Sequence, residues 1–125
     1  FPAIPASELF RMVSTNAVKA LKLPMDYAAL NPDNCHNLLL VDMVERDPFE
    51  NLFSIEAASI KLLIVDGIPR FGDSTWMETL GLNDDEYCLF RTSNKEKFVL
   101  GDPMEINDTI DAVLGYHKDF PYLPF

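Results

Sequence analysis

The chain has 125 residues, a hydrophobic fraction of 48% and a formal net charge of -10. This length suits one domain, and the composition is that of a globular protein rather than a disordered one. The negative charge disfavours nucleic-acid phosphates and anionic membrane surfaces, and no apolar run reaches the roughly 20 residues that span a bilayer. We therefore expect no nucleic-acid partner and no membrane association.

The cysteines and the first residues bear on the compartment. Cys35 and Cys88 are too few for a disulfide framework, so we interpret them as free thiols of a cytoplasmic protein, with a disulfide as the less favoured alternative. Residues 1–10 lack the basic start and apolar middle of a signal peptide. Because position 1 is Phe rather than Met, we expect a chain that was processed or cut from a longer one.

The first predicted element is a helix over residues 6–21. Its apolar residues recur at spacings of three and four and form one stripe. The polar run 14–16 interrupts the pattern, so two short helices with a break near Thr15 agree equally well with the sequence. Pro24 ends the element. The stripe consists of Leu9, Met12, Val13, Ala17, Ala20 and Leu21.

The next predicted elements are strands. After a turn-rich stretch, residues 38–44 are apolar on both faces, which predicts a strand that is buried on both sides or covered at one end. Residues 45–53 predict a loop with a short helical turn. A strand over 60–65 and a return strand over 68–71 flank Asp66-Gly67, a pair typical of a two-residue hairpin turn.

The last third contains both kinds of element. Residues 74–82 predict a short helix ending at Gly81, and a hairpin is predicted over 86–92 and 95–102. A helix over 106–120 follows, with Asn107 or Asp108 as its cap, and the chain closes in a proline-rich aromatic strap. The sequence therefore predicts an α+β fold. Its sheet is small, antiparallel or mixed, with four to six strands (a partial β-sandwich), and is packed with helices.

Three segments in a fixed order resemble one enzyme family. They read "ELFRMVSTNAVKAL" (8–21), "ALNPDNCHNLLLVDM" (29–43) and "DPFENLFSIEAASIKLLIVDGIPRFGD" (47–73). The order is similar to the C-terminal end of amidohydrolase-superfamily enzymes, which are metal-dependent hydrolases and deaminases built on a (β/α)₈ barrel. On this resemblance, residues 1–73 form the family-like segment of helices and sandwich strands. Residues 74–125 form a C-terminal extension, a hairpin plus a helix, packed on the same domain.

The resemblance implies that this chain is one part of a larger enzyme whose metal-binding residues lie in another part. The family binds a zinc-type divalent metal through a His-x-His pair, further histidines, often a carboxylated lysine, and an aspartate of the barrel. This chain has only His36 and His117. The implied function is a structural C-terminal part of an enzyme that hydrolyses non-peptide C–N bonds, with no catalytic, cofactor-binding or metal residue of its own. The implied partners are the barrel portion or further copies of this chain.

Several reactive groups have a second interpretation. Cys35-His36 could bind zinc or act as nucleophile and base, but adjacent side chains do not easily face each other, so we interpret them as a thiol beside a surface imidazole. His117 is interpreted as a packing residue on the apolar stripe of the last helix, near its C-terminus. Asp84-Asp85-Glu86 with Asp102 could suggest a cation site, but a solvated acidic loop fits better.

Four further carboxylates and an aromatic cluster complete the candidates. Asp42, Asp47, Asp66 and Asp73 could pair for acid–base work, but we interpret them as turn residues. Trp76 and the three aromatic residues of the strap are expected to pack against the domain, or against another chain where it is incomplete; those three are Phe120, Tyr122 and Phe125.

Two alternative functions remain. The first is a free-standing α+β interaction module, and the second is a small hydrolase that uses Cys35 and His36.

Overall fold

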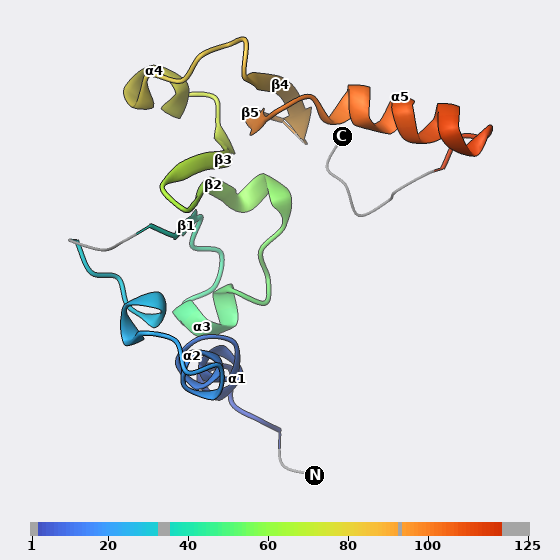
Figure 1. Cartoon of the computed structure of the whole chain (residues 1–125). Helices are drawn as coiled ribbons and strands as arrows, with labels where there is room; N and C mark the ends of the chain where they lie inside the picture. Colours follow the sequence, from blue (N-terminus) through green and yellow to red (C-terminus); the bar gives the residue numbers. More distant parts are fainter. Residues whose placement is uncertain (1–2, 33–35, 93, 119–125) are drawn as a thin grey trace.

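The computed structural model describes residues 3–32, 36–92 and 94–118. Figure 1 shows helices at the N-terminal end, a sheet in the middle and a long helix that projects from the far end of the sheet. The sheet has five antiparallel strands in the order β1-β2-β3-β5-β4. The predicted α+β class is therefore confirmed.

The N-terminal segment forms two helices, α1 (Ala6–Val13) and α2 (Thr15–Ala20). Ser14 separates them with φ -119° and ψ -98°, and its hydroxyl donates to the Phe10 carbonyl oxygen at 2.7 Å. A serine that bonds to the preceding turn in this way interrupts a helix. The two-helix alternative is thus confirmed, and a 3₁₀ turn, η1 (Met25–Ala28), follows.

The sheet is built around a hairpin between two central strands. β2 (Ile60–Val65) and β3 (Ile68–Asp73) are joined by the predicted two-residue turn, in which Asp66 and Gly67 have φ of 53° and 77°. Two consecutive positive φ angles match the right-handed twist of hairpin strands. β4 (Tyr87–Thr92) and β5 (Lys95–Leu100) form the second predicted hairpin, and β5 pairs with β3.

The strand predicted over 38–44 differs from the expectation. β1 (Leu38–Val41) is shorter and lies at the edge of the sheet. Leu39 and Leu40 are 44% and 38% exposed, so burial on both faces is wrong. The apolar sequence is necessary for such burial but not sufficient, because burial also requires other elements to lie over both faces of the strand.

The core lies on one face of the sheet under the short helix α4 (Trp76–Leu80), which ends at Gly81 as predicted. Phe98 is completely buried and packs edge-on against Tyr87 with 5.6 Å between ring centroids. Leu62 and Met77 complete the buried cluster. Trp76 packs against this cluster, which agrees with the expected burial of its ring. The strap residues Phe120, Tyr122 and Phe125 lie outside the described residues.

Gly72 allows the core to close. A Cβ atom at this position would lie 2.7 Å from the backbone oxygen of Lys61 and 3.0 Å from the Phe98 ring. Real Cβ atoms do not approach backbone oxygens so closely, so only glycine lets the aromatic ring lie against β3.

Two further helices both begin at an aspartate followed by a proline. Asp47 caps α3 (Pro48–Asn51) and Asp102 caps α5 (Pro103–Leu114), each carboxylate accepting two backbone N–H bonds with proline next in sequence. Proline suits this first helical position because its missing N–H is not needed there. The prediction of α5 over 106–120 with Asn107 or Asp108 as cap is therefore wrong at both ends, since Gly115 in a left-handed conformation ends the helix.

Candidate functional site

The strongest charged cluster lies where β1 ends. The Asp42 carboxylate accepts hydrogen bonds from Lys95 at 2.6 Å and from Lys61 at 2.9 Å, and so connects strands that are not neighbours in the sheet. These two ammonium groups lower the pKa of Asp42 to about 2, with Lys95 contributing most. Asp42 raises the pKa of Lys95 in return. A carboxylate that is ionised so firmly is a poor general base near neutral pH.

A second pair is buried deeper in the same sheet. Lys97 is 0% exposed, and its amine donates to the Asp73 carboxylate and, at 2.6 Å, to the Ile60 carbonyl oxygen. The amine also lies 5.9 Å from the centroid of the Phe71 ring. Each hydrogen bond joins β5 to a different partner, so the lysine ties three strands together. The interpretation of Asp42 and Asp73 as turn residues is therefore wrong, because both carboxylates form ion pairs with strand lysines.

A buried amide fixes the loop after β1. Asn51 is 1% exposed, and its side-chain oxygen accepts from the backbone N–H groups of Val44 and Glu45 at 2.7 and 2.9 Å. Its amide nitrogen donates to the Asp42 carbonyl oxygen at 2.9 Å. This amide thus holds the backbone that carries the Asp42 carboxylate.

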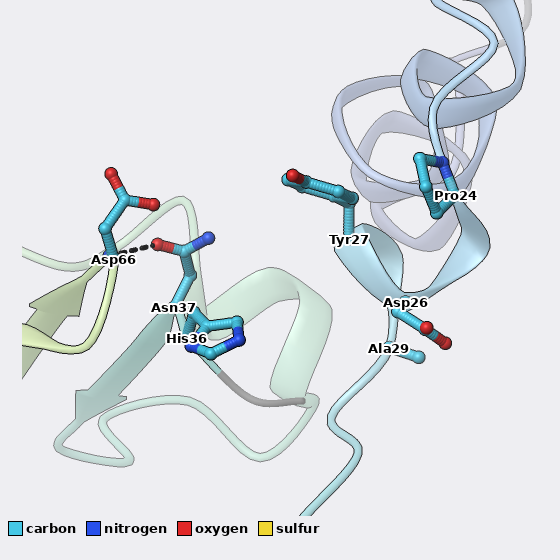
Figure 2. Close-up of a pocket in the computed structure, with 7 residues that line it drawn as sticks. All are labelled: Pro24, Asp26, Tyr27, Ala29, His36, Asn37 and Asp66. Atoms are coloured by element: carbon cyan, nitrogen blue, oxygen red, sulfur yellow. Dashed lines mark hydrogen bonds between the residues drawn. The ribbon is translucent and has the colours of Figure 1, made fainter. Parts of the chain in front are cut away.

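A cavity of about 400 Å³ opens between η1 and the turn of the central hairpin. Figure 2 shows Tyr27 on one side and His36, Asn37 and Asp66 on the other. The polar groups on the second side hold the turn: the His36 carbonyl accepts from Gly67 N–H at 2.7 Å, and the Asn37 amide oxygen accepts from Asp66 N–H at 2.9 Å. The cavity is lined by Pro24, Asp26, Tyr27, Ala29, His36, Asn37 and Asp66.

The cavity has the size of a small ligand site and two acidic residues in its walls, which favour a cation or a hydrogen-bond donor over an anion. Its wall includes His36 of the Cys35-His36 pair, but Cys35 lies outside the described residues. The structure therefore gives this pair no geometry that would distinguish a nucleophile and base from a surface imidazole.

The other candidates of the sequence stay apart from this cavity. His117 lies beyond the end of α5, exposed, with its Nδ1 2.6 Å from an Asp111 carboxylate oxygen. The interpretation of His117 as a packing residue on a helical stripe is therefore wrong. Its imidazole lowers the pKa of Asp111, and the Lys118 N–H adds to this effect. Asp47 and Asp102 cap helices, and Asp66 lies in the hairpin turn.

Metal-ligating groups are not clustered in the described part of the chain. Over residues 3–32, 36–92 and 94–118, no three His, Cys, Asp or Glu side chains are arranged to hold a metal ion. Cys88 is a half-buried free thiol, as predicted. Within the same residues, no helix is long and apolar enough to cross a membrane.

No protein-family model, curated protein or solved structure matches the chain. The site must therefore be interpreted from its own residues. What sequence reasoning missed is the pairing of lysines with Asp42 and Asp73. The alternation of Lys95 and Lys97 along β5 places both side chains on one face of the sheet, which was a usable signal.

Proposed function

We propose that the chain is a non-catalytic structural part of a metal-dependent amidohydrolase of the cytoplasm. In this proposal a zinc-type ion in the barrel portion activates the water that attacks a non-peptide C–N bond. This chain contributes sheet strands and flanking helices to the parent enzyme. It supports the reaction by stabilising the scaffold that holds the active site.

The amount of uncovered surface carries the proposal. The chain exposes 9278 Å², whereas a compact protein of 14.2 kDa exposes about 6,800 Å². The thirteen residues outside the described ranges can account for at most about 2,100 Å². The other residues then expose at least about 7,200 Å², whereas a compact protein of their mass, about 12.7 kDa, exposes about 6,200 Å². The excess of at least about 900 Å² on these residues is close to one partner's share of a standard protein interface. Such a surface suits a segment that is completed by further protein.

The edges of the sheet support the same proposal. β1 and β4 are both edge strands, and each exposes a leucine, Leu39 on β1 and Leu89 on β4. Proteins normally shield edge strands, because unpaired backbone groups beside apolar side chains invite another chain to pair with them. In the proposed parent, strands from the barrel portion would cover these edges.

The test compares this chain with the product of the longer reading frame. We expect the longer product to hold a stoichiometric zinc-type metal and to hydrolyse a small or cyclic amide, and the purified 125-residue chain to do neither. A chelator-treated longer product serves as the control for metal dependence. The proposal is refuted if the intact gene product has the mass of this chain, 14.2 kDa, or if this chain alone binds one zinc and hydrolyses an amide.

The alternative function, a free-standing α+β interaction module, is favoured by one observation. The cluster of Leu62, Met77, Tyr87 and Phe98 gives the sheet a small core of its own. Cooperative unfolding of this chain in isolation, with a gene product of matching mass, would select this alternative.

A further inference from the structure

The helix α5 carries an apolar stripe along one side. Ile106, Ile110, Val113 and Leu114 recur at spacings of three and four, which places them on the same side of the helix. None of them is buried, and Ile106 and Val113 are 61% and 81% exposed. Figure 1 shows that α5 projects from the end of the sheet. The stripe therefore has the form of a helix face that a further segment covers.

The chain turns back where α5 ends. Gly115 ends the helix with φ of 74°, and its N–H donates to the Asp111 carbonyl oxygen at 2.8 Å. The Asp111 carboxylate then holds the next residues, because it accepts from the Lys118 N–H at 3.1 Å and lies 2.6 Å from the His117 Nδ1. Since Asp111 belongs to the last turn of the helix, residue 118 lies beside that turn rather than beyond it. The residues that follow therefore start beside α5.

The stripe begins next to this point and lies within reach of the segment 119–125. Leu114 is three residues after Asp111, and residues at this spacing are neighbours on a helix surface. Ile106, at the far end of the stripe, lies about 7.5 Å back along the helix axis from Asp111, at about 1.5 Å per residue. Seven extended residues span about 23 Å, at about 3.3 Å per residue. The segment is therefore long enough to follow the whole stripe.

The composition of the segment 119–125 suits an apolar surface. It reads "DFPYLPF", with three aromatic residues, one leucine and two prolines. The prolines restrict the chain before it docks, so that fixing its backbone costs less conformational entropy than fixing an ordinary segment. Because the segment is joined to the helix, its effective concentration at the stripe is on the order of millimolar. A separate chain at a lower concentration competes poorly with a segment tethered in this way.

We propose that the segment 119–125 docks on the stripe of α5 in its own molecule, with its aromatic rings against the apolar side chains of the stripe. The contacts of Asp111 set the point from which the segment starts, and apolar burial stabilises the docked form. This contact does not involve the edge strands β1 and β4. Its test is therefore independent of the test of the proposed parent enzyme.

Chymotrypsin measures whether the segment is docked. Within the segment the protease cleaves after Tyr122, because proline follows the other internal aromatic residue and the leucine. Mass spectrometry follows the release of residues 123–125 from the full chain, and a peptide of residues 117–125 gives the rate without docking. The variant Val113→Ser removes an apolar side chain from the stripe. Its matched control is Met104→Ser, which removes a 54% exposed side chain from the opposite side of the same helix.

We expect the wild-type segment to be cleaved at least about tenfold more slowly than the peptide, and Val113→Ser to raise the rate about tenfold, because proteolysis follows the undocked population and the variant loses a buried valine contact. Met104→Ser keeps the wild-type rate, and circular dichroism confirms that both variants keep their helix content. In the wild-type chain, nuclear Overhauser effects between the rings of the segment and the methyl groups of the stripe provide a second measurement that needs no variant.

Three results overturn the inference. The first is a wild-type segment that is cleaved as fast as the peptide or gives no Overhauser effects to the stripe. The second is an equal effect of Val113→Ser and Met104→Ser, which would show that the stripe has no special role. The third is faster cleavage on dilution, which would assign the contact to a second copy of the chain.

Discussion

Removing Asp73 from the buried Lys97–Asp73 pair should lower the free energy of unfolding more than removing Lys97. The lysine side chain is 0% exposed and that of Asp73 is 22% exposed, so water reaches only the carboxylate. In an Asp73→Ala variant the ammonium group keeps the Ile60 carbonyl but has no counter-charge. Leaving one ion of a buried pair without its partner costs about 3–5 kcal/mol.

The converse variant is milder. Lys97→Met fills the same space with an apolar side chain and leaves a carboxylate that water solvates, so we expect a loss of about 1 kcal/mol. The double variant should be about 2 kcal/mol more stable than Asp73→Ala alone, because it has no stranded charge.

Urea unfolding followed by circular dichroism measures these differences, with the m-value checked for each variant. Asp85→Ala, in the exposed loop before β4, is the matched control and should change stability by less than about 0.5 kcal/mol. If Asp73→Ala is too unstable to measure, Asp73→Asn, which removes the charge but keeps a hydrogen-bond acceptor, provides a second measurement. The reasoning fails if Lys97→Met is the more damaging variant, or if the double variant is no better than Asp73→Ala.

Three further variants test the sheet and its loop. Gly72→Ala should lower the free energy of unfolding by about 1–3 kcal/mol, because its Cβ meets a backbone oxygen; a Phe98→Leu change in the same chain should not rescue it, and rescue would show that only the ring is in the way. Asn51→Ala should cost about 2–3 kcal/mol and speed proteolysis after β1, because it removes three hydrogen bonds to backbone; unchanged proteolysis would contradict the proposed anchoring. The Asp42 pair stabilises the fold above the usual pKa of 3.8 and loses this effect as pH falls to about 2. The melting temperature of wild type should therefore exceed that of Asp42→Asn at pH 6, with the difference vanishing near pH 2, and a difference of equal size at both values would refute this.

Local signals in the sequence predicted the local structure well. Asp66-Gly67 fixes the central hairpin because both residues take positive φ, and Gly81 ends α4 for the same kind of reason. The start of α5 was missed although its signal was present, since an aspartate followed by proline also begins α3. Counting apolar positions placed the start too late, because the count began at Ile106 and passed over the Asp102-Pro103 signal.

Properties that depend on distant segments could not be predicted in the same way. The burial of β1 depends on which elements lie over its faces, and its own residues do not state this. The pairing of Asp73 with Lys97 requires β3 to lie beside β5 rather than β4, which the spacing of the strands does not reveal. No candidate residue of the sequence was brought into a catalytic arrangement in the described part of the chain.

The strand order has a consequence for how the molecule is assembled during synthesis. Of the described strands, β5 is the last to leave the ribosome, yet it lies between β3 and β4 and supplies Phe98 to the core. Until residue 100 has emerged, the earlier hairpin has an open flank and lacks the Phe98 ring on its inner face. The nascent chain therefore needs its final third to complete its fold. A stop codon placed shortly before β5 would yield an unstable product that is degraded, rather than a smaller stable sheet.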